Sequence, residues 1–194
     1  IRDFENSNLI KIELGDIRNL RYVNRIFEKY KPRYVVNFAA ESHVDNSISC
    51  PLAFVETNIV GTACLLDAVR LSEHECRMVQ ISTDEVYGSI EDGSFTEKSP
   101  LNPSSPYSAS KSAADLLALA YYKTYDLDIV ITHSSNNYGP NQHPEKLMPK
   151  IINRAINFEN IPIYGDGSNV REWTHVIDNV RAVRMVMEKG LSGE

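Results

Sequence analysis

The sequence predicts an α/β fold in which a doubly wound parallel sheet carries helices on both faces. Short segments rich in Val, Ile and other apolar residues alternate repeatedly with segments of helical periodicity. The connections between them have ordinary lengths, and no internal repeat or low-complexity segment interrupts the pattern. Alternation of this kind is typical of parallel strands joined by helical crossovers.

The first half of the chain supplies the clearest periodicities. Alternating apolar and polar residues predict the first strand, and a proline in its first turn suits the long helix at the end of this half. The predicted elements are a strand at 9–14, a helix that ends at Lys31-Pro32, a strand at 34–38, a loop at 39–49 and a helix at 51–71.

The second half begins with a compact apolar strand and ends less regularly. After the last buried strand the chain becomes polar and rich in proline, which is typical of a loop that carries a site. The predicted elements are strands at 77–82 and 129–132, a helix at 107–125, a loop at 136–149, a helix at 150–158, a strand and turn at 161–167 and a helix at 176–189.

Composition excludes several classes of protein. The formal net charge of −6 argues against a nucleic-acid-binding surface, which would need a clustered basic face. Cys50, Cys64 and Cys76 form no Cys-x-x-Cys pair, so they predict neither a disulfide framework nor a zinc site. The histidines are scattered along the chain, and we expect no metal. Reduced thiols fit a cytosolic protein.

A membrane location is not expected. The sequence has no basic and then apolar N-terminal signal. The longest apolar run, at 59–69, is short for a bilayer span and is interrupted by Asp67. We therefore expect a soluble, intracellular protein.

Two adjacent acids follow the strand at 77–82. Thr83, Asp84 and Glu85 fall where this strand ends, and ligands of open α/β sheets bind at the carboxyl ends of the strands. Taken alone, such an acid pair is more often a solvated turn than a site for acid–base chemistry.

Tyr107 and Lys111 begin an Ala-rich helical segment and lie on one helix face. An ammonium group beside a phenol favours the phenolate, so we expect Lys111 to lower the pKa of Tyr107 and make it a general base. The spacing alone is weak evidence for a catalytic pair, because an ordinary amphipathic helix also carries a Tyr and a Lys four residues apart.

Together these stretches resemble the extended short-chain dehydrogenase/reductase family and, within it, the dTDP-glucose 4,6-dehydratases. Tyr-x-x-x-Lys marks only the superfamily, whereas Thr-Asp-Glu after the strand is more specific. The resemblance covers nearly the whole chain, in segments 15–17, 38–45, 82–88, 107–111, 135–140, 144–147 and 161–167.

The resemblance implies a reaction in three stages with bound NAD: oxidation of the sugar at C4, elimination of water across C5 and C6, and reduction at C6. In it Tyr107, helped by Lys111 and Thr83, takes the hydroxyl proton. Glu85 acts as the base at C5, and Asp84 protonates the departing C6 hydroxyl.

The resemblance also implies binding residues. Those for the cofactor are Asp16, Ile17, Phe38, Ala39, Ala40, Glu41, Thr57, Tyr107, Lys111 and Asn137. Those for the sugar nucleotide are Ser42, Thr83, Asn136, Lys146, Leu147, Pro162, Ile163, Tyr164 and Arg171. Each has a simpler explanation: Asp16 as a helix cap, for example, or Arg171 in a surface salt bridge.

The nine glycines include no Gly-rich turn after a first strand, the feature that brings backbone N–H groups to a dinucleotide pyrophosphate. We expect residues 1–135 to be a Rossmann-like NAD-binding domain without its first βαβ unit. Residues 136–194 would be part of a smaller sugar-nucleotide-binding domain, with a helix that returns to the first domain. The chain is thus interpreted as an internal fragment of a longer enzyme, and alone it should be inactive.

Several alternatives stay open. His133 and Asn46 stand where the family has Arg, and Asn141 stands where an aromatic residue is common, so the nucleotide and the sugar are less certain than the reaction. The alternative functions are a UDP-glucose 4,6-dehydratase, a 4-epimerase, a UDP-glucuronate decarboxylase or a catalytically silent protein that binds NAD or a sugar nucleotide. The resemblance further implies a cytoplasmic homodimer, paired through helices 51–71 and 107–125, and a role such as rhamnose biosynthesis.

Overall fold

The computed structural model describes residues 9–163 and 165–194. Its centre is a parallel sheet of three strands in the order β1-β2-β3. They are β1 (Tyr34–Asn37), β2 (Arg77–Thr83) and β3 (Ile129–Ser134). The parallel sheet predicted from the alternation of elements is confirmed.

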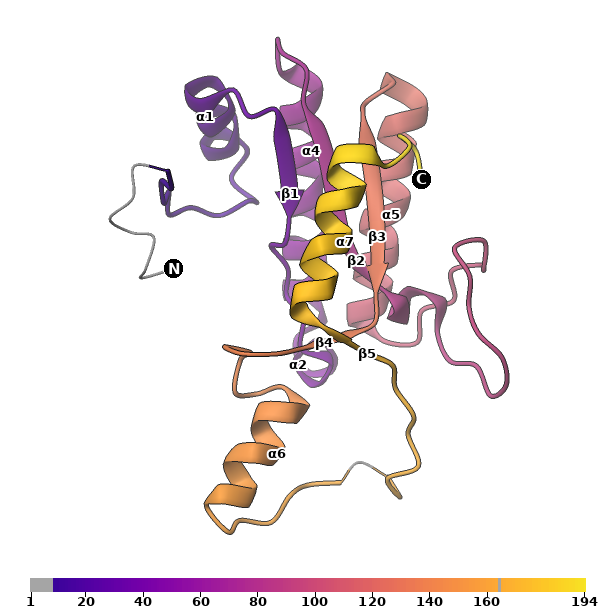
Figure 1. Ribbon diagram of the computed structural model, residues 1–194. Coiled ribbons are helices and arrows are strands. Elements are labelled where there is room, and N and C mark those ends of the chain that lie inside the picture. Colours follow the sequence, from indigo (N-terminus) through magenta and orange to yellow (C-terminus); the bar gives the residue numbers. More distant parts are fainter. Residues whose placement is uncertain (1–8, 164) are drawn as a thin grey trace.

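Helices cover both faces of this sheet, as Figure 1 shows. Helices α4 (Gly61–Leu71) and α5 (Pro106–Tyr125) lie on one face, and α7 (Val176–Lys189) lies on the other. Successive β2 residues point to opposite faces: Met78 packs in the cluster with α4 and α5, and Val79 packs against Val183 of α7. Helix α1 (Leu20–Tyr30) packs on α4. The doubly wound arrangement is thereby confirmed.

The predicted helix at 51–71 is continuous but contains a π-helical segment, which periodicity did not predict. Its parts are α3 (Pro51–Phe54), the π segment η1 (Val55–Val60) and α4. Contrary to the sequence expectation, this helix is long and apolar enough, by length and composition, to cross a bilayer. Core helices meet the same criterion, and here Phe54 and Leu66 are fully buried within the fold.

The predicted strand at 9–14 is wrong. This segment is irregular and pairs with no strand in the described part of the chain, and Leu9 and Leu14 are about nine-tenths exposed (91% and 90%). Alternation alone does not make a strand, because a strand needs a neighbour to take its backbone hydrogen bonds.

Three further expectations need correction, and one pair of short strands was not predicted. The loop at 39–49 contains α2 (Val44–Ser49), and the predicted helix at 150–158 is α6 (Leu147–Ile156). Residues 161–163 and 165–167 form no strand, and Tyr164 lies outside the described residues. A short parallel pair forms instead, β4 (Asn136–Tyr138) with β5 (Trp173–His175). Strands of three mostly polar residues carry too little apolar periodicity to be recognised in a sequence.

Helix α5 begins one residue earlier than predicted because of a capping box. The Ser105 hydroxyl accepts the backbone N–H of Ser108, and the Ser108 hydroxyl accepts that of Ser105. Pro106 occupies the first turn, where its missing N–H costs nothing. This start fixes the position of Tyr107 at the carboxyl end of the sheet.

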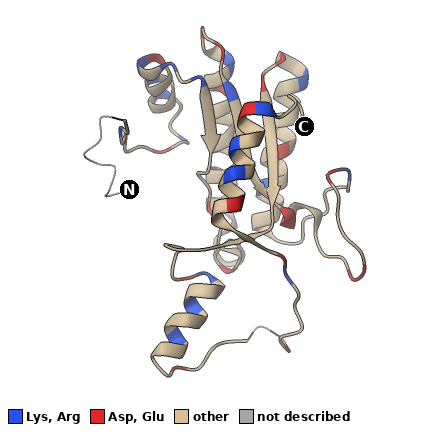
Figure 2. Ribbon diagram, in the orientation of Figure 1, with Lys and Arg blue, Asp and Glu red and all other residues tan. Residues whose placement is uncertain are grey.

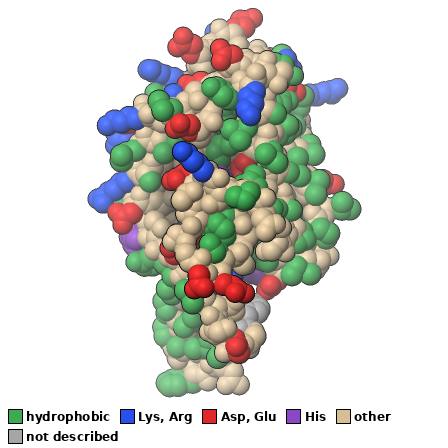
Figure 3. Space-filling model, turned by 90° about the vertical axis from the view of Figure 1, so that its right-hand side faces the viewer, with side chains coloured by type: hydrophobic (Ala, Val, Ile, Leu, Met, Phe, Trp, Pro, Cys, Tyr) green, Lys and Arg blue, Asp and Glu red, His purple; other side chains and the backbone are tan. Residues whose placement is uncertain are grey.

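The segment that carries α6 extends below the sheet in Figure 1. No residue of α6 is buried. In the side view of Figure 3, hydrophobic side chains lie along this narrow lower part. The exposed hydrophobic residues of α6 and the turn after it include Ile152, Ile156 and Phe158, at 58%, 70% and 97%.

Candidate active site

The acid pair lies where β2 ends and a short 3-10 turn, η2 (Asp84–Tyr87), begins. The Thr83 hydroxyl caps this turn: it accepts the Glu85 backbone N–H at 3.3 Å and donates to Asp84 Oδ1 at 3.2 Å. Gly88 ends the turn with a φ of 86°, and a Cβ there would lie 2.4 Å from the Asn102 carbonyl oxygen. The turn therefore requires glycine and holds both carboxylates at the strand end.

Burial raises the pKa of both acids. For Asp84 desolvation outweighs the hydrogen bond from Thr83. For Glu85 desolvation is followed by repulsion from Asp84, while the positive charges of Arg171 and Lys146 oppose the rise. The two pKa values move in the same direction, so both carboxyls hold protons more tightly than an exposed acid does.

Tyr107 and Lys111 lie on α5 beside this strand end. The pKa of Tyr107 is raised to about 12, first by burial and then by the charge of Glu85, although a hydrogen bond with Thr83 lowers it. The expectation that Lys111 lowers the pKa of Tyr107 is therefore wrong for this arrangement. Lys111 is itself buried, its pKa is lowered by desolvation, and its ammonium group donates to the Ile81 carbonyl oxygen.

Some of the predicted sugar-nucleotide residues come together around the acid pair. Lys146 donates to the Ser42 carbonyl oxygen at 2.9 Å, although 104 positions separate the two in sequence. Lys146 and Arg171 both act electrostatically on Glu85. Asn136 lies on β4, directly after β3.

The remaining residues of the predicted sugar-nucleotide set make fewer contacts with the acid pair. Leu147 is the first residue of α6 and is 44% exposed. Pro162 and Ile163 lie in the exposed irregular segment, and Tyr164 is outside the described residues. Within the described residues, neither Pro162 nor Ile163 forms a hydrogen bond or an ion pair with the acid pair.

The predicted cofactor residues near the N-terminal end of the chain are already partnered. Arg18 binds the Asp16 carboxylate at 2.7 Å and Glu56 at 2.9 Å. Ile17 packs against the cluster that contains α4. Thr57 lies half-buried on the π segment, a kind of helix distortion that recurs at functional sites.

Two buried asparagines that the sequence reading missed hold the loop after β1, which carries Phe38, Ala39, Ala40 and Glu41. Asn37 Oδ1 accepts the Ala39 backbone N–H, and its amide donates to Gln80 Oε1 at 2.9 Å. Asn58 binds both backbone groups of Glu41 and donates to the Ser110 hydroxyl at 2.8 Å. The signal for Asn37 was an amide inside an apolar strand; Asn58 had none.

Asn137 presents a vacant hydrogen-bond acceptor. Its amide nitrogen donates to the Ser134 hydroxyl and the Ser135 carbonyl oxygen. Its Oδ1 is buried and has no hydrogen-bond partner within the described residues. Such an atom can accept a hydrogen bond from a bound molecule.

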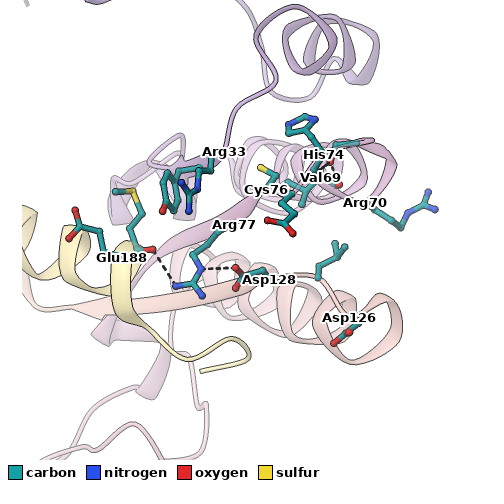
Figure 4. A pocket seen from close by; sticks show the side chains of 14 residues that line it. Arg33, Val69, Arg70, His74, Cys76, Arg77, Asp126, Asp128 and Glu188 are labelled. Carbon is teal, nitrogen blue, oxygen red and sulfur yellow. Dashed lines mark hydrogen bonds and ion pairs between the residues drawn. The ribbon is translucent and has the colours of Figure 1, made fainter.

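A hollow lies at the amino-terminal end of the sheet, opposite the acid pair (Figure 4). Arg77 crosses it, binds Asp128 at 2.7 Å and donates to the carbonyl oxygens of Met187 and Gly190. These bonds tie β2 to the start of β3 and the end of α7, which is a structural role. The described residues contain no group of three or more His, Cys, Asp or Glu that could hold a metal ion.

Comparison with known proteins places these features in a family. The model of the family described as GDP-mannose 4,6 dehydratase matches residues 2–194. The chain is 48% identical over its whole length to dTDP-glucose 4,6-dehydratase of Haemophilus influenzae, of which it covers 60%. It is 54% identical over 93% of its length to the low-salt glycan biosynthesis protein Agl12 of Haloferax volcanii, of which it covers 57%.

Solved structures similar to this chain come from the same group of enzymes. The dTDP-glucose 4,6-dehydratase DesIV of Streptomyces venezuelae, with NAD and TYD bound, matches the whole chain with a TM-score of 0.95 and 47% identity. The chain covers 59% of that structure, so it spans somewhat more than half the length of the relatives it matches. The chain therefore belongs to the GDP-mannose 4,6 dehydratase family, within the extended short-chain dehydrogenases/reductases.

Proposed function

We propose that the whole protein is an NAD-dependent dTDP-glucose 4,6-dehydratase. The observation that carries this proposal is the joining of Thr83, Asp84 and Glu85 to Tyr107 at the carboxyl end of β2. The charge of Glu85 acts on Tyr107, and Thr83 contacts both Asp84 and Tyr107. Relatives about half identical to the chain carry the same name.

The chain's own residues divide the proton transfers between them. Tyr107 takes the proton of the sugar C4 hydroxyl, with Thr83 as its hydrogen-bond partner and Lys111 one helical turn away on α5. Glu85 removes the C5 proton, and Asp84, whose burial favours its protonated form, gives a proton to the leaving C6 hydroxyl. NAD, when bound, supplies reversible acceptance of hydride.

The residues present fit this cofactor. The orphaned Asn137 Oδ1 offers an acceptor, and the exposed Phe38 and Ala39 follow the carboxyl end of β1, where dinucleotides bind in such sheets. The residues that we propose to hold NAD are Asp16, Ile17, Phe38, Ala39, Ala40, Glu41, Thr57, Tyr107, Lys111 and Asn137.

The sugar nucleotide is assigned to the other half of the site. Figure 2 shows that α6 carries positive but no negative side chains, although the chain as a whole is acidic. Lys146, Lys150 and Arg154 repeat at helical spacing and favour an anionic ligand. We propose residues 1–135 as the NAD-binding domain and 136–194 as part of the substrate domain. The proposed substrate contacts are Ser42, Thr83, Asn136, Lys146, Leu147, Pro162, Ile163, Tyr164 and Arg171.

The test is to incubate the full-length protein with dTDP-glucose deuterated at C4. We expect a 4-keto-6-deoxy product that has lost water and carries the label at C6. Recovery of only the C4 epimer would contradict a dehydratase and favour an epimerase. Binding of NAD and sugar nucleotide without any product would favour a silent member of the family.

We further infer a homodimer paired through the helix at 51–71 and α5. Leu52, Val60 and Leu116 on these helices are exposed by 71%, 46% and 56%, and Figure 3 shows hydrophobic side chains spread over the α5 side of the molecule. An interface would remove these side chains from water. Light scattering on the full-length protein should give twice the monomer mass, and a monomer at micromolar concentration would contradict the pairing. The exposed Cys50 thiol fits a reducing compartment such as the cytoplasm.

A further inference from the structure

A buried charged cluster lies directly behind the proposed catalytic residues and has no role in the steps above. Its centre is Asp115, a residue of α5 that is 2% exposed. Asp115 Oδ2 accepts the Ser82 hydroxyl at 2.5 Å and lies 3.1 Å from His133 Nε2. Ser82 and His133 are register partners on β2 and β3, so two strands hold one carboxylate of the covering helix.

Two hydrogen bonds fix the orientation of the His133 ring. Its Nε2 lies 3.1 Å from Asp115 Oδ2, and its Nδ1 lies 2.6 Å from the Tyr87 hydroxyl. Because a carboxylate only accepts hydrogen bonds, the ring N–H on Nε2 is the group that can donate to Asp115.

Lys111 is the cation nearest to this carboxylate along the helix. Tyr107, Lys111 and Asp115 are spaced four residues apart, which places them on one face of α5. Burial disfavours the ammonium form of Lys111, and Asp115 is the charge that counters this effect. The second carboxylate oxygen, Oδ1, is buried and has no hydrogen-bond partner in the part of the chain described, so it remains available to the Lys111 charge.

We propose that Asp115, held by Ser82 and His133, is a positioning residue that keeps the buried Lys111 side chain charged, one helical turn from Tyr107. This inference rests on the proposed function, since it gives Lys111 the state that its role requires. The titratable groups that interact with Asp115 come from three elements: Lys111 and Tyr107 on α5, Tyr87 on η2 and His133 on β3. Without the Asp115 charge, the buried ammonium of Lys111 would lose its proton at lower pH.

The test follows the Lys111 side chain by NMR in full-length protein with ¹³C-labelled lysine, assigned by loss of the signal in Lys111→Ala. Asp115→Asn should lower the pKa of Lys111 by about one unit or more. If the protein turns over dTDP-glucose, the alkaline limb of kcat should move to lower pH by a similar amount, with a larger effect on kcat than on KM. An unchanged Lys111 titration in Asp115→Asn would overturn the proposal.

Two further variants separate charge from packing. Asp126→Asn changes the same chemical group at the C-cap of α5, where a φ of 55° suits asparagine, and should leave the Lys111 titration unchanged. Ser82→Ala removes the 2.5 Å hydrogen bond but keeps the carboxylate, so the melting temperature should fall while the pKa of Lys111 stays within about 0.3 units. An equal pKa drop in Ser82→Ala would show that loosened packing is the cause. The titration needs no turnover, so loss of the proposed function and loss of this pairing give different results.

Discussion

The two halves of the proposed site are built differently. The catalytic half, at the end of β2 and the start of α5, consists of half-buried and buried side chains, and hydrogen bonds tie the buried Lys111 and Asp115 to β2. The substrate half, on α6 and the segments around it, has no buried residue on its helix, and it acts on the acid pair through the charges of Lys146 and Arg171. The contrast indicates that the fold itself holds the proposed catalytic residues in place, whereas the proposed substrate contacts depend on fewer interactions.

The largest expected effect is on the catalytic half. Glu85→Gln should lower turnover of dTDP-glucose about 10²- to 10⁴-fold, because it removes the base of the elimination step. The first hydride transfer should survive, and single-turnover absorbance of reduced nicotinamide should detect it. Tyr107→Phe should instead weaken that first step. Full turnover by Glu85→Gln would show that another group is the base.

The bonds by which Asn58 ties the loop after β1 to α5 should matter for stability. Asn58→Ala removes a buried side chain that makes three hydrogen bonds, to both backbone groups of Glu41 and to Ser110. We expect the free energy of unfolding to fall by about 3 kcal/mol, because the partners are left unsatisfied. Urea denaturation of the full-length protein measures it.

The matched control is Asn46→Ala, an exposed asparagine on α2, which should change the free energy of unfolding by less than about 0.5 kcal/mol. Similar losses in both variants would mean that Asn58 stabilises the loop no more than a surface residue does.

Burial of Tyr107 predicts a pH-dependent stability. Its pKa is raised from 10.0 to about 12, so the folded protein holds this proton more tightly than the unfolded chain. The resulting stabilisation is fully present below pH 10 and is lost as the pH rises through about 12. It amounts to about 2 to 3 kcal/mol.

Denaturation curves of wild type and Tyr107→Phe at pH 8 and pH 11 test this expectation. Wild type should lose stability relative to the variant at the higher pH. A constant difference between the two proteins would show that Tyr107 is not buried in the whole protein.

The smallest effect is expected in the substrate half. Lys146→Ala removes a half-exposed charge-assisted hydrogen bond to Ser42. The KM for dTDP-glucose should rise about fivefold to tenfold, or about 1 kcal/mol, with kcat little changed. Lys123→Ala, at an exposed position in the last turn of α5, is the control and should leave KM unchanged. A fall in kcat as large as that of Glu85→Gln would remove the distinction between the halves.

The sequence predicted the sheet and its covering helices because their signals are local and repetitive. Strands such as β2 are apolar runs, and helices such as α5 begin at recognisable caps. It failed at 9–14, where alternation exists without a partner strand, and at β4 and β5, which are too short for a pattern. Strands that pair are distant in sequence, so the pairing itself produces no periodic pattern of residues.

In the candidate site, too, local features were predicted and tertiary contacts were not. The acid pair and Tyr107 were recognisable from their place after a strand and at a helix start. The direction of the Tyr107 pKa was predicted wrongly, because desolvation depends on tertiary packing and outweighs the nearby ammonium. Asn58 and the Asp115 cluster are also tertiary: Asn58 meets Ser110 across 52 positions, and Ser82 meets Asp115 across 33.

The π-helical segment at 55–60 has a consequence for chain length. A π turn spans about one residue more than an α turn, so this segment is equivalent to a single-residue insertion that the helix absorbs without breaking. The extra residue widens the turn that carries Thr57 and Asn58, and it puts the residues before and after it out of helical phase. A homologue shortened by one position here would restore a regular helix and rotate Asn58 away from Glu41 and Ser110. In an alignment, a gap at this place would mark a homologue in which the loop after β1 is not held by the residue equivalent to Asn58.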